Sequence, residues 1–155
     1  MDNTNVIRVG FNTQKIKITD TNGAIDDPIG RSGKVFTMLC FINADDKGGE
    51  AIKALETGLP KTSMGIDVIP VAIAPVKLKI GRAFKEKAGF HVRLFCDNDL
   101  RLGKAYSIVD STKAQPAYHP TIFIAGDDGS IRYRCAIDSP DTDWEQLRLT
   151  ISRLI

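Results

Sequence analysis

The sequence predicts a single α/β domain with a mixed central sheet and helices on both faces. Three observations support this prediction. Strands of the buried type alternate with amphipathic helices through the middle of the chain, an order that requires parallel strands and right-handed crossovers. A Gly-Asp-Asp-Gly turn between two apolar segments then predicts an antiparallel hairpin. With 155 residues, 43% hydrophobic and 26% charged, the chain has the length and composition of one globular domain.

The first half of the chain predicts two strands and a helix. Residues 1–14 are polar and are expected to form a loosely ordered arm, ahead of a single domain over residues 15–155. Alternating polar and apolar residues at 15–19 predict a half-buried strand. The β-branched and aromatic run 34–43 predicts a strand buried on both faces. After a polar loop, the apolar spacing over 50–59 predicts a helix.

The following segments continue the alternation of strands and helices. Residues 66–74 predict a second buried strand, although Pro70 favours a bulge or a position near the sheet edge. Apolar spacing over 77–89 predicts a helix that ends at its last glycine. Residues 92–96 predict a third strand, and residues 98–106 predict a short helix.

The last part of the chain predicts a hairpin and a closing helix. A long loop over 107–119 leads to two strands, at 121–125 and 130–137. A Thr142-x-x-Glu145 capping box then starts a helix. The apolar residues on one face of this helix are Trp144, Leu147, Ile151, Leu154 and Ile155. The helix completes a sheet that is covered on both faces.

Charge and cysteine content narrow the function classes. The chain has 21 Lys and Arg against 19 Asp and Glu, a net charge of +2, spread without a basic cluster that would predict nucleic-acid binding. No segment is apolar for long enough to span a membrane, and the first residues do not resemble a signal peptide. The three cysteines, Cys40, Cys96 and Cys135, include no close pair, which excludes a CxxC motif and favours a reducing compartment, the cytoplasm. No motif predicts a metal ion or a cofactor.

Several short segments of the sequence, taken in order, resemble the motifs of a known family. They are Gly10 with Ile16-x-Ile18-x-Asp20-x-Asn22-Gly23, Gly33-Lys34-Val35, Cys96-Asp97 with Leu102-x-x-Ala105-Tyr106, and Pro120-Thr121-Ile122-Phe123-Ile124 with Asp128-Gly129-Ser130-Ile131. This ordered set resembles the alkyl hydroperoxide reductase/thiol-specific antioxidant (peroxiredoxin-like) branch of the thioredoxin superfamily. The resemblance runs from about Gly10 to Ile155 and implies a thioredoxin-like fold.

The resemblance also implies where redox chemistry would take place. In thioredoxin-like oxidoreductases the CxxC pair follows the first buried strand, at a helix N-terminus that stabilises a thiolate. Those positions are Asp46-Lys47-Gly48-Gly49 here, and none is a cysteine. The proline, threonine or serine, and peroxidatic cysteine of peroxiredoxins would fall near Asn43, Lys47 and Glu50. Residues Asp46, Lys47, Gly48, Gly49 and Glu50 therefore form a degenerate active-site loop.

Two interpretations of this loop remain open. Its acids and glycines could bind a cation or a peptide backbone, or the loop could be solvated, with Asp46 as a helix cap; the second is favoured. The resemblance implies a groove beside Pro120, which occupies the place of the thioredoxin-type cis-proline and shapes the groove for a partner peptide. His119 and Thr121 flank this proline. His119 is either an acid–base or hydrogen-bonding group of the groove or a surface loop histidine, and the second is favoured. The expected partner is a protein or peptide, and the resemblance is compatible with a homodimer.

Cys96 is the best remaining thiol candidate. It ends a predicted parallel strand, so it is expected at the same sheet edge as Asp46, where α/β sheets place ligands and catalytic groups. Asp97 beside it is expected to disfavour the thiolate. Two functions follow: a thioredoxin-like binding domain without catalysis, which we expect, or a divergent thiol peroxidase or thiol–disulfide oxidoreductase that uses Cys96.

Overall fold

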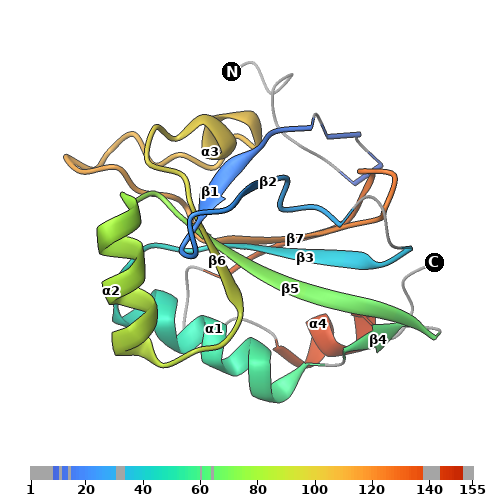
Figure 1. The fold of residues 1–155 in the computed structure, drawn as a ribbon. Helices are drawn as coiled ribbons and strands as arrows, with labels where there is room; N and C mark the ends of the chain where they lie inside the picture. Colours follow the sequence, from blue (N-terminus) through green and yellow to red (C-terminus); the bar gives the residue numbers. More distant parts are fainter. Residues whose placement is uncertain are drawn as a thin grey trace.

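A computed structural model describes residues 9, 10, 12, 13, 15–30, 34–59, 61–63, 65–137 and 144–151. Within them, the strands are β1 (Ile18–Asp20), β2 (Ile25–Asp26), β3 (Phe36–Phe41), β4 (Thr62–Ser63), β5 (Ile66–Ala74), β6 (Arg93–Cys96), β7 (Thr121–Ala125) and β8 (Ile131–Ala136). The helices are α1 (Asp46–Gly58), α2 (Leu78–Ala88), α3 (Arg101–Ala105) and α4 (Trp144–Ile151). The sheet runs β2-β1-β6-β5-β3-β7-β8, and β4 pairs with β5 (Figure 1).

Three parallel strands form the centre of this sheet. β3 pairs with β5 and β5 with β6 in parallel, whereas β7 is antiparallel to β3 and forms a hairpin with β8. The predicted α/β fold with a mixed sheet and a C-terminal hairpin is therefore confirmed. β2 and β4 were not predicted, because strands of two residues are too short to produce a periodic signal.

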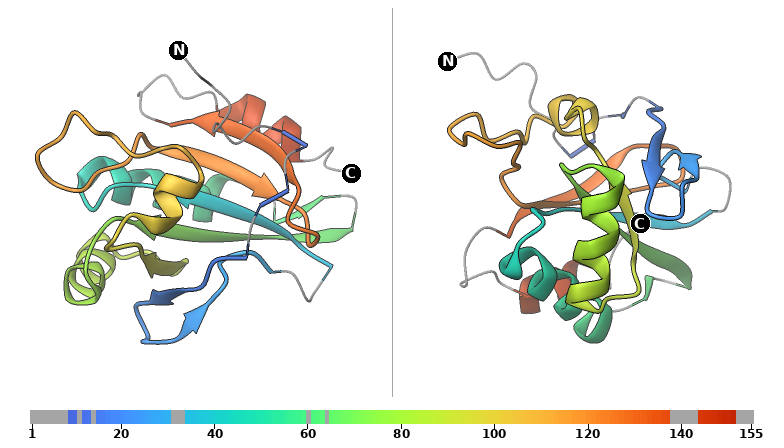
Figure 2. Two further views of the ribbon diagram at one scale, coloured as in Figure 1. Left: turned by 90° about the horizontal axis from the view of Figure 1, so that it is seen from above. Right: turned by 60° about the vertical axis from the view of Figure 1, so that its left-hand side comes forward.

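Helices cover both faces of the sheet. Figures 1 and 2 show α1, α2 and α4 on one face, while α3 lies over the other, on the side of β1. Within the described residues, no helix is long and apolar enough to cross a bilayer. The expected helix start at Thr142 and the apolar positions Leu154 and Ile155 lie outside the described residues. Leu147 and Ile151 are buried, as predicted for the closing helix.

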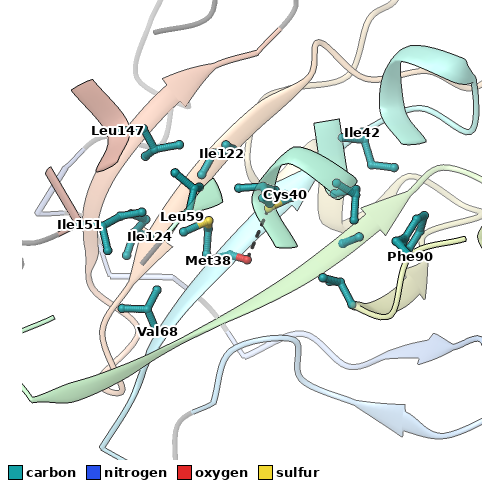
Figure 3. Packing of buried hydrophobic residues seen from close by; sticks show 14 of the residues in the cluster. Met38, Cys40, Ile42, Leu59, Val68, Phe90, Ile122, Ile124, Leu147 and Ile151 are labelled. Carbon is teal, nitrogen blue, oxygen red and sulfur yellow. Dashed lines mark hydrogen bonds between the residues drawn. The ribbon is translucent and has the colours of Figure 1, made fainter. Parts of the chain in front are cut away.

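The core is divided in two by β3, whose residues are all buried. On the side of α1 and α4 the cluster includes Met38, Cys40, Ile42, Ile122, Ile124, Leu147 and Ile151 (Figure 3). On the side of α3 it includes Leu39, Phe41, Ile73, Phe95, Tyr106, Tyr118 and Phe123. Each large apolar side chain buried in this way contributes about 1.5–3 kcal/mol, so the central strand fixes the sheet on which the candidate site is built.

Pro70 is accommodated within β5 by the uneven lengths of the neighbouring strands. β3 pairs with β5 without interruption from Phe36 opposite Val68 onward, so there is no bulge at the proline. On the other side, β4 pairs only as far as Asp67, and β6 begins opposite Val71. Pro70 thus lies in a gap between two partners, where its missing N–H costs no ladder hydrogen bond.

The arm and the domain boundary are only partly within the described residues. Gly10 donates a backbone hydrogen bond of 2.6 Å to the Ile131 carbonyl, and Thr13 donates one of 3.0 Å to the Gly129 carbonyl. These residues therefore contact the β7–β8 hairpin. Residues 1–8, 11 and 14 lie outside the described residues.

Candidate functional site

Helix α1 begins at the sheet edge where β3 ends. Asp45 is its N-cap: the backbone is extended, with φ of −140°, and the carboxylate accepts a hydrogen bond of 2.8 Å from the Gly48 N–H. Asp46, the expected cap, is instead the first helical residue, so that expectation is wrong by one position. The cap falls on Asp45 because its oxygen then satisfies the N–H three residues later, which the helix itself leaves unpaired.

Residues 46–50, expected as a loop, form the first turns of α1. Their charged members are exposed, whereas Gly48 and Gly49 are buried. A Cβ at Gly48 would lie 2.0 Å from the Asn43 carbonyl oxygen, and one at Gly49 would lie 3.0 Å from the Ala88 Cβ. Glycine has low helix propensity, but a Cβ at Gly48 would overlap the backbone, and one at Gly49 would be a tight contact. Close packing therefore outweighs propensity, and the helix starts four residues earlier than predicted.

Asn43 joins the end of β3 to the segment before β7. Its Nδ2 donates a hydrogen bond of 3.0 Å to the Tyr118 carbonyl, and its Oδ1 accepts one of 2.8 Å from the Tyr118 N–H. The amide thus satisfies both backbone groups of one residue, at a separation of 75 positions. Residues 46–50 and 118–121 consequently lie along one edge, which we call the rim.

Tyr118 also extends from the rim to the end of β6. Its hydroxyl donates a hydrogen bond of 2.5 Å to the Asp97 carboxylate, which further accepts from the backbone N–H groups of Leu102 at 3.0 Å and Gly103 at 2.8 Å. Asp97 is 0% exposed and Tyr118 1% exposed. Burial, and then the negative charge of Asp97 and the hydrogen bond to it, hold the pKa of Tyr118 well above its ordinary value. The tyrosine is therefore a neutral donor that braces the rim.

Cys96 does not reach the rim. It lies at the carboxyl end of β6, as expected, but its Sγ lies 2.7 Å from the place of a Cβ at Gly81, beneath α2. Only 8% of the residue is exposed. Burial raises the pKa of the Cys96 thiol, the charge of Asp20 raises it further, and Arg82 lowers it. The carboxylate that disfavours the thiolate is thus Asp20, and not Asp97 as expected.

His119 and Pro120 occupy the exposed part of the rim. The His119 side chain is 59% exposed, with Nε2 3.9 Å from an Asp110 oxygen. Its backbone N–H donates to the Ile108 carbonyl at 2.7 Å, and its carbonyl accepts from the buried Thr121 hydroxyl at 2.8 Å. No peptide bond among the described residues is cis, so the bond before Pro120 is trans, contrary to the thioredoxin-type arrangement. These hydrogen bonds hold the segment in an ordinary trans geometry.

The structure therefore brings together residues 46–50 and His119, Pro120 and Thr121, and leaves Cys96 apart. β5 separates β6 from β3, so their backbones are about 10 Å apart. The described residues contain no group of three or more His, Cys, Asp or Glu that could hold a metal ion. Sequence reasoning missed the bracing role of Tyr118, for which a tyrosine in a long loop gives no periodic signal.

Comparisons with known proteins find similarity at the level of the fold. No family model matches the chain, and no curated protein matches it. Solved structures do. A peroxiredoxin-like protein from Aquifex aeolicus matches with a TM-score of 0.76 at 12% identity, over 97% of this chain and 89% of that one.

This chain has the peroxiredoxin fold. Two further structures agree. The peroxidoxin BcpB from Mycobacterium tuberculosis matches with a TM-score of 0.73 at 12% identity, over 94% of this chain and 96% of that one. The mitochondrial 2-Cys peroxiredoxin from Plasmodium falciparum matches with a TM-score of 0.70 at 17% identity, over 93% of this chain and 92% of that one. The expected thioredoxin-like fold is confirmed, and it is similar to the fold of peroxiredoxin structures. At identities this low, structural similarity establishes the fold alone. The chemistry must be argued from the site.

Proposed function

We propose that this chain is a thioredoxin-family protein without the family's redox chemistry, which binds a protein or peptide partner at the rim. The observation that carries the proposal is the composition of the rim. Residues 46–50 and 118–121 contain no cysteine, although the start of α1 is where a helix N-terminus would stabilise a thiolate.

The rim has the properties of a binding surface. Asp46, Lys47, Glu50 and His119 are exposed and offer both donors and acceptors. The backbone beneath them is fixed by the Asn43 amide and the Tyr118 hydroxyl. A surface that is already ordered loses little entropy when a partner binds. These features favour recognition of a peptide backbone and its side chains.

The alternative is a divergent thiol peroxidase or thiol–disulfide oxidoreductase that uses Cys96. Two observations favour it: Cys96 lies at the carboxyl end of a parallel strand, β6, and the positive charge of Arg82 lowers the pKa of its thiol. Burial and Asp20 act in the opposite direction, and the net pKa is raised. A nucleophile also needs access to its substrate, which Gly81 and α2 obstruct.

The proposal includes a compartment and an assembly state. The three cysteines are free, which favours the reducing environment of the cytoplasm. β2 is one end of the sheet and exposes Ile25, and an unpaired edge strand of this kind can pair with a second copy in a homodimer. Light scattering coupled to size exclusion tests the dimer: a monomeric mass that persists at high protein concentration would contradict it.

Thiol mapping separates the two functions. The protein is treated with equimolar hydrogen peroxide, with and without a small-thiol reductant, and each cysteine is followed by mass spectrometry. Cys96→Ser and Cys135→Ser are compared with the unsubstituted chain. The binding function predicts slow oxidation, no faster than that of free cysteine, and equal peroxide consumption by both variants. Rapid, reductant-reversible oxidation of Cys96, with consumption lost only in Cys96→Ser, would establish the peroxidase.

Site-directed crosslinking tests the rim itself. A photoreactive amino acid is placed at Lys47, at His119 or, as a control, at Lys61, an exposed residue just before β4. The proposal predicts adducts of the same discrete masses from the two rim positions and none of these masses from Lys61. Equal adducts from all three positions would rule out a specific surface at the rim.

A further inference from the structure

Helix α2 carries more positive charge than the whole chain. Residues 77–89 contain five basic residues and one acid, a net charge of +4, so the rest of the chain carries −2 and the total is +2. The basic residues are Lys77, Lys79, Arg82, Lys85 and Lys87. Three of them, Lys79, Arg82 and Lys85, follow one another at intervals of three along the helix and form what we call the basic face of α2. The even spread of charge expected from the sequence therefore does not hold at this helix.

These charges are not neutralised within the structure. None of the five residues takes part in an ion pair with any other residue that the structure describes. All are exposed except Lys85, which is half-buried. The Arg82 Nε donates a hydrogen bond of 2.7 Å to the Thr21 carbonyl, which orients the guanidinium and leaves its charge uncompensated.

The arrangement opposes the stability of the isolated helix. Lys79 and Arg82, and likewise Arg82 and Lys85, are three residues apart on one helix, where like charges repel. The first turn contains no acid, and Lys77 provides no side-chain cap, so cations lie at the positive end of the helix dipole. A negatively charged partner would reduce both the repulsion between these side chains and their unfavourable interaction with the helix dipole.

A hollow in the surface lies beside α2 and is lined in part by its basic residues. Its volume is about 480 Å³, and its lining includes Thr21, Asn22, Arg82, Lys85, Glu86 and His91. Two of the three residues of the basic face, Arg82 and Lys85, thus line one concavity, together with the acid Glu86. A carboxylate on a short side chain fits such a surface, since Arg and Lys donate strong charge-assisted hydrogen bonds to carboxylates.

We propose that the basic face of α2 binds an acidic segment of a partner protein, rich in Asp and Glu, with one carboxylate in the hollow between Arg82 and Lys85. A surface helix that binds a bilayer needs an apolar face for insertion, and α2 offers only Ile80, 52% exposed. Single-stranded nucleic acid needs exposed aromatic rings for stacking, and the one aromatic of α2, Phe84, is half-buried. This surface goes beyond the rim and does not depend on the function proposed for it.

Charge reversal tests the proposal with a defined probe. Binding of a fluorescein-labelled peptide of alternating glutamate and serine is followed by anisotropy, at low and at physiological ionic strength. The test variant combines Lys79→Glu with Arg82→Glu. The control combines Lys34→Glu with Lys61→Glu, which makes the same change in net charge just before β3 and β4, at the end of the sheet away from α2 (Figure 1). A neutral pair, Lys79→Gln with Arg82→Gln, completes the set.

The expected result is a loss of affinity of at least about tenfold in the α2 reversal, a smaller loss in the neutral pair, and a change within about twofold in the control. Affinity should also fall as salt rises. Lys79→Glu places an acid at the helix start, which favours the fold, and circular dichroism confirms that each variant is folded. Equal losses in the test and control pairs would overturn the proposal. So would tighter binding to phosphatidylserine vesicles or to single-stranded DNA than to the peptide.

Discussion

The Tyr118 hydroxyl and the Asp97 carboxylate meet at 2.5 Å in a place where neither residue is exposed to solvent. The contact links the segment before β7 to the end of β6, two strands that are not neighbours in the sheet. A carboxylate that is fully buried must receive hydrogen bonds to offset the loss of water. Tyr118 supplies one of three, and the N–H groups at the start of α3 supply the others.

Tyr118→Phe should therefore destabilise the protein by about 1–3 kcal/mol, because the ring remains while a buried charge loses a donor. Urea unfolding measures the change. Asp97→Asn provides the second arm of a double-mutant cycle, in which a coupling of at least about 0.5 kcal/mol is expected. Strictly additive effects would mean that the hydroxyl and the carboxylate do not interact.

Asn43→Ala should cost about 1–3 kcal/mol in the free energy of unfolding, because it removes two hydrogen bonds and leaves both backbone groups of Tyr118 unpaired. Asn98→Ala is the matched control, since Asn98 is exposed. It should change stability by less than about 0.5 kcal/mol. Equal effects of the two substitutions would show that the amide of Asn43 does not hold the rim.

Gly48→Ala and Gly58→Ala should have opposite signs, although both glycines lie in α1. A methyl group at Gly48 would meet the Asn43 carbonyl oxygen, so a loss of about 1–3 kcal/mol is expected. At Gly58 the nearest atom is 3.8 Å away, and alanine should add up to about 1 kcal/mol through its higher helix propensity. Thermal unfolding of both variants checks the signs, and stabilisation by Gly48→Ala would contradict the close approach.

Asp20 should make the protein sensitive to acid. Burial alone would raise the pKa of this carboxyl, but hydrogen bonds from Arg93 and from the N–H groups of Ala24 and Asn22 outweigh it, and the net pKa lies below the ordinary value of 3.8. Its contribution to stability is therefore complete above the unfolded-state pKa and is lost as pH falls through the lower, folded-state pKa.

The measurement compares Asp20→Asn with the unsubstituted chain in urea at pH 7 and at pH 3. The variant should be less stable at pH 7, and the difference should shrink at pH 3, where the carboxyl of the unfolded chain is already largely protonated. A difference that is the same at both pH values would show that the Arg93 contact depends on shape and not on charge.

Much of the fold could be predicted because a long apolar segment in the sequence indicates a buried strand or helix. β5 and β7 have the predicted bounds, 66–74 and 121–125. The start of α1 could not be predicted, since two glycines argue locally against a helix. The contact that requires Gly48 involves the Asn43 carbonyl and exists only after the turn has formed.

The candidate site was predictable in topology but not in orientation. Parallel strands bring their carboxyl ends to one edge, so the rim and Cys96 were expected together. Which face a strand residue points to changes at every position, and Cys96 points beneath α2, where Gly81 leaves room for its sulfur. The partner of Tyr118 lies 21 residues earlier, across a loop without periodicity, so no pattern in the sequence indicated it.

Pro70 has a consequence for how copies of this chain behave toward one another. The gap between β4 and β6 leaves part of β5 uncovered, and Ile66 and Ile69 are exposed beside it. An uncovered strand with apolar side chains is a template for aggregation, because a foreign strand can add to its free N–H and C=O groups. The proline has no N–H to offer there, so it opposes the addition of a foreign strand at this gap, as gatekeeper residues do.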